Sequence, residues 1–460
     1  MKRINIFLVI IILLLASNVV KAQEAAAKLK LSGELITDER FLLKEPNSWA
    51  WNENRLSLKF DKKIKNNSKF HSEVWFRNIG LPNLTTSANL YNKGIVDPYN
   101  LEIREAYVQV NGFLSKNLDL KIGRQFIVWG TADKLNPTSN LNPYDMEDIL
   151  DFGRHRASDA INMNYYLSND YSLQVVFIPF FHPVNMPIGI FADALSPSIS
   201  LSQGMVLRGM SDTLLMPKYN LQESSTAGFK FKGYFKGIDF SLSYLWGRDG
   251  LPIATRNTFI PIDNLGGINI NSQLSFTRTH IIGADLSTSI VGIGFWAEAA
   301  AFIPENNVIM TNDLSALYPL SPIPVTMDTM LLDKTKPYIK FILGGDYNFS
   351  DGSYINIQYL HGFINESGSD NLNDYFFMRY EKKFFNEKLT VAPIGGAFIV
   401  TDWGKIKNNY AIAYIPQITY KATDDIEIIL SAAIFDGKGD NLFAKLKDYN
   451  MFMFKMKYSF

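Results

Sequence analysis

Segments in which apolar and polar side chains alternate recur along almost the whole chain, each about ten residues long. Successive side chains of a strand point to opposite faces, so this period of two predicts strands with one apolar and one polar face. The sequence predicts about 18 strands, or 16 if one pair has been divided wrongly. The predicted strands are 28–36, 52–61, 70–78, 102–111, 118–129, 160–167, 171–180, 227–235, 238–247, 279–288, 291–302, 338–349, 354–362, 374–382, 389–400, 410–420, 426–435 and 451–460.

The connections between these segments alternate between short and long. The short ones, such as 168–170 and 350–353, carry the Gly, Asn, Asp and Ser residues of tight hairpins. The long connections are 130–159, 181–226, 248–278 and 303–337. This sorting is typical of a transmembrane antiparallel β-barrel with long extracellular loops and short periplasmic turns. The predicted fold is therefore all-β.

The last ten residues, MFMFKMKYSF, alternate strictly and end on an aromatic side chain. A closing barrel strand has reason to end in this way, because its terminal aromatic anchors at the membrane interface. The pattern resembles the C-terminal signal read by the outer-membrane barrel assembly machinery, which we therefore expect as a partner. The residues on the signal face are Phe452, Phe454, Met456, Tyr458 and Phe460.

The first residues combine a short basic start with an apolar run too short to span a membrane. They predict a signal peptide over 1–22, cleaved near Ala22, followed by one barrel domain over 23–460. The chain has no Cys, which excludes disulfides, thiolate metal sites and a lipoprotein anchor. Lys+Arg and Asp+Glu balance at 45 each, so nucleic acid is not an expected partner. We expect the outer membrane as the location and its lipids as the surroundings.

The alternation also predicts which side chains face the lumen. In 291–302, Ile293 and Phe295 share one face and Glu298 lies on the other. A charge facing lipid costs several kcal/mol, so the polar face should line the interior. The side chains predicted to line the pore are Arg124, Glu298, Lys340, Asp346, Asn356, Gln358 and Lys455.

The connection 130–159 holds the densest group of charges outside the strands. Folded inward, it would set acidic and basic groups across the pore and filter solutes by their charge. The alternative is a solvated surface loop whose charges only keep it soluble. The residues proposed for this constriction are Asp145, Glu147, Asp148, Asp151, Arg154 and Arg156. Their spacing matches no calcium loop, and no metal site is predicted.

Other chemistry is sparse. The connection 181–226 is rich in apolar residues, which indicates either a plug or hydrophobic-ligand patch, or a loop packed on its neighbours. Five His occur, and none stands in a spaced ligand or nucleophile motif, so neither an enzyme nor a cofactor is expected. A barrel enzyme using His280 or His361 stays open as an alternative.

Several stretches together resemble an uncharacterised family of proteobacterial outer-membrane barrels that carry a domain of unknown function. The clearest is LKIGRQFIVWGTADKLNPTSNLNPYD (120–145), with the pattern GRQ-x-x-x-WG. Further similarity lies in 103–110, 279–302, 343–349 and 415–443. Members are often encoded beside exporters of the RND superfamily, so the resemblance implies transport across the outer membrane, with an inner-membrane exporter as a potential partner.

The predicted function is a porin-like channel for the passage of solutes. The alternatives are a transporter of hydrophobic compounds or lipids, a barrel enzyme, and a structural or adhesive barrel. The solute, its direction of travel and the oligomeric state do not follow from the sequence.

Overall fold

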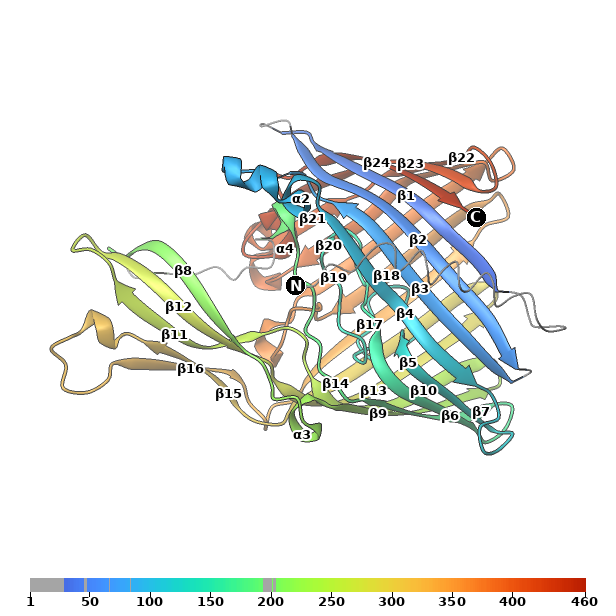
Figure 1. Cartoon of the computed structure of the whole chain (residues 1–460), viewed down its shortest axis with the longest axis horizontal. Helices are drawn as coiled ribbons and strands as arrows, with labels where there is room; N and C mark the ends of the chain where they lie inside the picture. Colours follow the sequence, from blue (N-terminus) through green and yellow to red (C-terminus); the bar gives the residue numbers. More distant parts are fainter. Residues whose placement is uncertain (1–28, 45–47, 66, 83, 193–200, 202–203) are drawn as a thin grey trace.

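The protein is an antiparallel β-barrel, seen in a computed structural model that describes residues 29–44, 48–65, 67–82, 84–192, 201 and 204–460 (Figure 1). The wall consists of β1 (Lys30–Leu42), β2 (Trp49–Lys65), β3 (Ser68–Ile79), β4 (Tyr99–Val110), β5 (Leu118–Gln125), β6 (Ser158–Tyr166), β7 (Tyr171–Ile178), β9 (Thr226–Phe235), β10 (Ile238–Arg248), β13 (Arg278–Ile290), β14 (Ile293–Pro304), β17 (Tyr338–Asn348), β18 (Ser353–His361), β19 (Asp374–Phe384), β20 (Leu389–Val400), β21 (Tyr410–Tyr414), β22 (Gln417–Lys421), β23 (Ile426–Lys438) and β24 (Met451–Ser459). The predicted signal peptide and its cleavage site lie outside the described residues.

These 19 strands form one sheet, in which β21 and β22 both pair with β20 and β23. The two short strands share one position in the wall, so the barrel has 18 strand positions, as predicted. The sheet closes where β1 pairs with β24 over nine residue pairs. Gly33 and Phe460 exchange two backbone hydrogen bonds at this closure, 2.8 and 3.0 Å long. Closure leaves no open sheet edge, which a membrane-spanning sheet requires.

The connections are sorted as the sequence predicts. Short turns such as 236–237 and 291–292 lie at one end of the barrel, together with the C-terminus. Every long connection lies at the other end, called here the loop end. The wall also has the predicted faces: Phe295 is 41% exposed on the outside, whereas Glu298, three residues later on β14, is 2% exposed inside.

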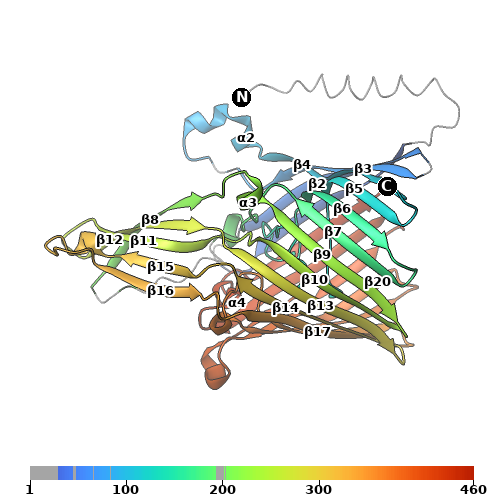
Figure 2. The same cartoon turned by 90° about the horizontal axis from the view of Figure 1, so that it is seen from below.

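The long connections hold a second sheet, which the sequence analysis treated as loops. It comprises β8 (Val206–Leu215), β11 (Ile253–Pro261), β12 (Gly267–Ser275), β15 (Val308–Asp313) and β16 (Thr326–Leu332). Figure 2 shows it extending from the loop end away from the barrel. The alternation in these segments is short and broken, and β8 pairs with β12 in parallel from a distant connection. Local pattern alone therefore could not reveal it.

The helices among the described residues are few and short. They are η2 (Ser87–Tyr91), α2 (Lys93–Val96), η3 (Gly189–Phe191), α3 (Leu221–Ser224), η4 (Ser315–Leu317), η5 (Ser369–Asn371), η6 (Trp403–Asn408) and α4 (Leu442–Lys445). None of the helices in the described part of the chain is long and apolar enough to cross a membrane.

Candidate functional site

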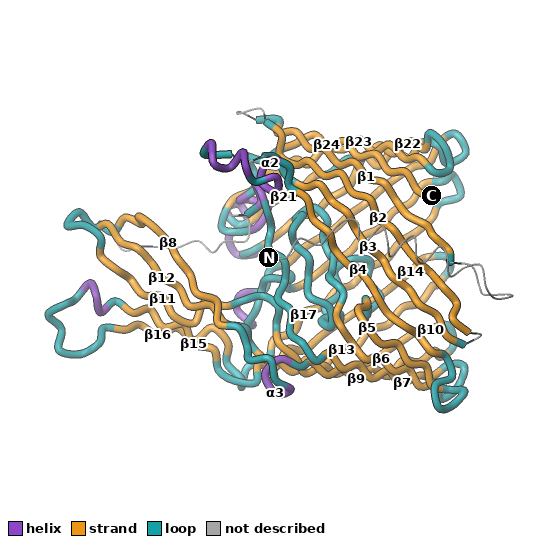
Figure 3. Tube along the Cα trace, in the orientation of Figure 1, coloured by secondary structure: helices purple, strands orange, loops and turns teal. Residues whose placement is uncertain are grey.

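The connection between β5 and β6, residues 126–157, turns into the barrel and lies across its lumen at the loop end (Figure 3). We call this segment the plug. The sequence left two interpretations open for it, an inward constriction and a solvated surface loop. The structure has it inward, with Trp129, Asn142 and Asp145 all less than 5% exposed.

The first half of the plug is held by one carboxylate of the wall. Glu298 on β14 accepts the backbone amides of Thr131 and Ala132, each at 2.5 Å. It also accepts the Asn136 side-chain amide at 2.8 Å and the Thr138 hydroxyl at 3.0 Å. Four donors satisfy the buried carboxylate, which would be costly to bury without them.

A bend at a glycine allows the plug backbone to approach Glu298 this closely. Gly130 has φ +90°, and a Cβ at this position would lie 2.4 Å from a Glu298 carboxylate oxygen. Glycine adopts this backbone conformation without steric cost and leaves room for the carboxylate.

The second half of the plug is held by arginines of the wall. Arg40 on β1 binds Asp148 through two hydrogen bonds of 2.8 and 2.5 Å. Arg77 on β3 donates to Glu147 at 2.7 Å. Such charge-assisted bonds are among the stronger ones in proteins, and these are removed from water.

Asp145 completes this set of ion pairs. It lies 3.2 Å from Arg104 on β4 and 3.0 Å from Arg154 of the plug itself. The pairing matters for function, because each acid of the set is compensated by a neighbour. A strong transverse field in an open pore would need these charges unpaired.

The pKa values of titratable groups in the plug depend on their burial and on their neighbours. Burial by itself would raise the pKa of Asp148, but the charge and hydrogen bonds of Arg40 outweigh it and hold the pKa below its ordinary value. Burial opposes Arg154 and Arg104 in the same way at Asp145, whose pKa is also lowered. Burial lowers the pKa of His155, whose Nδ1 lies 2.9 Å from the Asn142 carbonyl oxygen.

Two further wall strands contact the plug. On β18, Asn356 and Gln358 donate to Asp133 at 2.9 and 3.0 Å. On β7, Gln174 accepts the Trp129 indole N–H at 2.8 Å. The plug is thus bonded around the lumen, and not along one side only.

Three more connections enter the lumen beside the plug. Lys340 on β17 donates to the carbonyl of Phe363 at 2.7 Å and so holds the β18–β19 connection inside. Phe443 of α4 and Phe191 of η3 are fully buried in the same apolar cluster as Leu135 of the plug. The loop end is therefore filled by packed side chains.

Under the plug the barrel leaves a cavity of about 360 Å³. One part of its lining is apolar, with Leu135, Leu150, Phe152, Ile342, Phe377 and Phe443. Another part is polar, with Asp133, Asn356, Gln358, Arg379 and Gln417. Such a mixture suits a small molecule that is mostly apolar and carries a hydrogen-bonding group.

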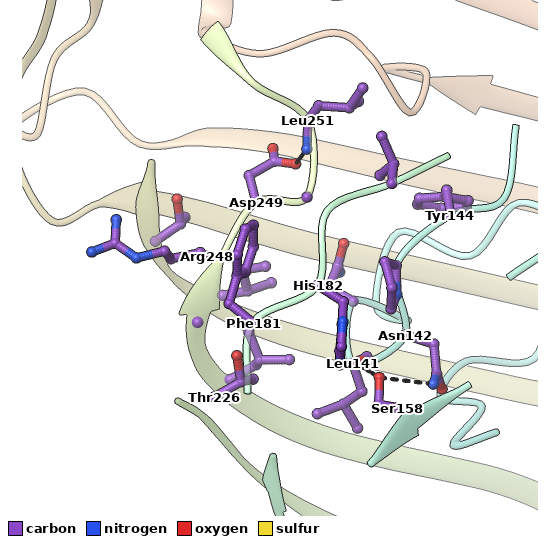
Figure 4. A pocket seen from close by; sticks show the side chains of 18 of the residues that line it. Leu141, Asn142, Tyr144, Ser158, Phe181, His182, Thr226, Arg248, Asp249 and Leu251 are labelled. Carbon is purple, nitrogen blue, oxygen red and sulfur yellow. Dashed lines mark hydrogen bonds between the residues drawn. The ribbon is translucent and has the colours of Figure 1, made fainter. Parts of the chain in front are cut away.

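A second cavity, of about 80 Å³, lies between the plug, the segment after β7 and the barrel wall (Figure 4). Phe181, His182 and Tyr144 line it, together with Asp249 at the end of β10. Burial raises the pKa of Asp249, and its carboxylate accepts the Leu251 amide at 2.9 Å.

The remaining residues predicted for the pore are scattered. Asp346 accepts the Tyr354 hydroxyl at 3.1 Å, and Lys455 pairs with Asp38 at 2.8 Å, both inside the barrel. Arg156 donates to the side chain of Asn185 at 3.0 Å, so it joins the plug to the segment after β7. Asp151 lies 3.6 Å from Arg154.

The prediction for Arg124 is wrong. The sequence predicted it in the lumen, but the ladders on both sides of β5 run without a shift, so Arg124 keeps the outward face of Ile122. There it donates to the Ile103 carbonyl at 2.8 Å and lies 3.6 Å from Asp159. The residues on the inward face of β5 include the fully buried Gln125.

The wall arginines Arg40, Arg77 and Arg104 were not predicted from the sequence. A usable pattern was present, because inward positions on β1, β3 and β4, with only β2 between β1 and β3, each carry an arginine near the loop end, and the connection 126–157 is rich in acids. The fourth partner, Glu298, was predicted for the lumen but not as an anchor of the plug.

One group of side chains in the described residues has metal-ligand spacing. The ligand atoms of His71, Glu73 and Glu105 lie within 4.8 Å of one another. His71 is already bonded to Asp61 at 2.8 Å, and Glu73 accepts the indole N–H of Trp75 at 2.7 Å. These protein partners explain the cluster without an ion.

The profile of the family described as a protein of unknown function, DUF1302, matches residues 54–340, which is more than half of the chain. The chain belongs to that family. The matched region of this DUF1302 protein contains the plug, Glu298 and two of the three wall arginines, Arg77 and Arg104. No curated protein matches the chain at a significant level.

Solved structures similar to this DUF1302 barrel are outer-membrane proteins. OmpF of Salmonella typhi, in complex with daunomycin, is 9% identical, with 95% of this chain and 99% of that chain covered and a TM-score of 0.41. OmpT of Vibrio cholerae in its trimer form is 10% identical, with 95% and 100% covered and the same TM-score. Likenesses this remote carry no argument about function.

Proposed function

We propose that this protein is an outer-membrane transport barrel that carries small, mostly apolar molecules through a plugged lumen. The apolar outward face and the closed sheet support a place in a bilayer. Long loops at one end and short turns with the C-terminus at the other support an orientation with the loops outside the cell. The protein would reach the outer membrane after removal of the predicted signal peptide. The aromatic face of its last strand would be recognised by the barrel assembly machinery.

The observation that carries this proposal is the plug above the cavity. Wall bonds from β1, β3, β4, β7, β14 and β18 hold the plug across the lumen. A filled loop end opposes free flow of water and ions, whereas a cavity under it can accept a molecule when the plug shifts. Selection would then depend on fit to the cavity rather than on diameter alone.

The experiment compares ion flow with uptake of an apolar probe. Wild-type protein in planar bilayers should give only small or rare conductance steps, and cells with the barrel in their outer membrane should take up N-phenyl-1-naphthylamine faster than cells without it. Deleting residues 131–152 should give large, steady conductance. A wild-type protein with large, steady conductance and no gain in probe uptake would contradict the proposal.

The second candidate is a channel for polar solutes, as the sequence first predicted. The polar part of the cavity lining favours it, because Asn356, Gln358 and Arg379 lie along the inside of the wall. Uptake of a small sugar through the wild-type barrel, with no effect on the apolar probe, would favour this candidate over the first.

We also propose that the barrel is not an enzyme and that it works with an inner-membrane exporter, as the family resemblance implies. Among the His residues considered for catalysis, His280 is bonded to the Tyr244 hydroxyl and His361 to Asp374, each at 2.8 Å. An exporter would have to reach the short periplasmic turns. Crosslinking from Cys introduced in the 350–353 turn would test that contact.

A further inference from the structure

The wall beside the cavity contains a break in its hydrogen-bonded ladder. β20 pairs with β21 over five residue pairs and with β22 over four, and between these pairings lie Pro393–Gly395 on one side and residues 415–416 on the other. Three residues of β20 thus face two of the neighbouring strand, which is a bulge. The pairing of β20 with β19 is shifted at the same level, between Tyr380 and Lys382.

Few bonds cross this seam. A single backbone hydrogen bond joins Pro393–Gly395 to residues 415–416 in the described structure, from the Ile415 amide to the Gly395 carbonyl at 2.7 Å. Pro393 has no N–H to donate, and its carbonyl accepts the Tyr414 side-chain hydroxyl at 2.7 Å. A side-chain hydroxyl thus satisfies the Pro393 carbonyl at the bulge, whereas proline offers no donor to the ladder.

The seam is also thin. Gly395 and Gly396 have no side chains on either face of the wall, and both line the cavity under the plug. A Cβ on Gly395 would lie 2.6 Å from the Ile415 carbonyl oxygen. The backbones are therefore close, with little except main chain between the cavity and the outside.

The outer side of the seam is apolar. Pro393 and Ile394 are both exposed on the outside of the barrel, because the bulge turns two successive side chains outward. On the inside, Ile415 and Ala413 continue the apolar lining of the cavity. The charged side chain Arg379, which also lines the cavity, is paired with Gly395 from β19, on the opposite side of β20 from the seam.

We propose that this seam is a lateral portal, through which a mostly apolar small molecule passes between the cavity and the hydrocarbon layer of the membrane. The portal rests on the proposed function, because it gives the cavity's ligand a route that avoids the filled loop end. Opening requires β20 to part from β21 and β22 at the bulge, where the ladder is weakest. The polar part of the cavity would hold the ligand's hydrogen-bonding group until the seam opens.

The test closes the seam with an engineered disulfide, called here the seam staple. The chain has no Cys, so Val391→Cys with Ile418→Cys, which are paired across β20 and β22 next to the bulge, would form the only disulfide. The matched control is Ala284→Cys with Ala299→Cys, paired across β13 and β14, which β17, β18 and β19 separate from β20. Uptake of N-phenyl-1-naphthylamine by cells is measured with each staple oxidised and reduced, and binding of the probe to purified protein is measured by equilibrium dialysis.

The oxidised seam staple should lower uptake to the rate of cells without the barrel, restore it on reduction, and leave probe binding in place. The control staple should change neither. Unchanged uptake with the oxidised seam staple, while wild-type binding and uptake persist, overturns the portal and leaves the proposed function standing. Absence of both binding and uptake in the wild type overturns both.

A second variant decides the matter if the staple prevents folding. Tyr414→Phe removes only the hydroxyl that bonds to Pro393, and it should speed uptake about fivefold, the ratio that corresponds to one hydrogen bond. The control is Tyr244→Phe, which removes a hydroxyl bonded to His280 across β10 and β13, away from the seam. Equal rates for Tyr414→Phe and the wild type would count against the portal.

Discussion

The two halves of the plug are held across the same lumen by opposite means. In the first half, backbone amides and neutral side chains converge on one wall carboxylate, Glu298. In the second half, plug acids are distributed over separate wall arginines, Arg40, Arg77 and Arg104. The first arrangement concentrates the attachment at one residue, whereas the second divides it among several. The two halves should therefore respond differently to single substitutions and to pH.

The largest effect is expected from Glu298→Ala. It leaves four donors of the plug without their acceptor, at a cost of roughly 1–3 kcal/mol for each donor that water does not reach. The first half of the plug should leave the wall, which would raise ion conductance in planar bilayers and expose residues 130–142 to protease. Glu73→Ala is the control, because Glu73 is a lumen glutamate bonded to Ser57 and Trp75 of the wall. Equal conductance for the two variants would contradict the role given to Glu298.

The next effect is expected from Arg40→Leu. Removing one partner of a buried ion pair leaves an uncompensated charge and costs about 3–5 kcal/mol. Asp148 loses both of its hydrogen bonds to Arg40, but the remaining arginines still hold the second half of the plug. We expect a smaller rise in conductance than with Glu298→Ala, measured in the same bilayers.

Arg379→Leu is the matched control for Arg40→Leu. Arg379 is also a lumen arginine, and it is bonded to Glu381 of its own strand at 2.8 Å. If Arg379→Leu opened the barrel as much as Arg40→Leu, loss of a lumen charge rather than loss of the plug contact would be the cause.

The same contrast explains what could be predicted from sequence. The wall has a period of two that each strand repeats locally, so all strand positions of the wall and their faces followed from the pattern, with Arg124 on the outward face as an exception. The plug's partners could not follow, because Arg40 and Asp148 are 108 residues apart and nothing local encodes their contact. The second sheet could not be predicted for the same reason, because β8 pairs with β12 although the β9–β10 hairpin of the wall lies between them in the sequence.

A more modest effect is expected from Gly130→Ala. The added Cβ would meet the Glu298 carboxylate, and the backbone at φ +90° is unfavourable for alanine, a strain of order 1–3 kcal/mol. Conductance should rise less than with either charge variant. Gly189→Ala, which lies in η3 outside the plug, is the control for backbone strain at the loop end, because Gly189 has φ +61° with no atom within 4 Å of the added Cβ. An equal rise in both variants would show that backbone strain, and not contact with Glu298, loosens the plug.

The smallest effect is expected from mild acid, and its direction follows from the lowered pKa values of Asp145 and Asp148. A carboxyl whose pKa is depressed in the plugged state stabilises that state above its ordinary pKa of about 3.9, and this contribution is lost as the pH falls toward the depressed value. Wild-type conductance should therefore stay level from about pH 7 to 5 and rise only at more acidic pH. In Arg40→Leu, Asp148 loses the partner that lowers its pKa, so the rise should begin at higher pH than in the wild type. A wild-type barrel that opens already at about pH 5 would show that the arginine-bound half does not hold the plug as its geometry implies.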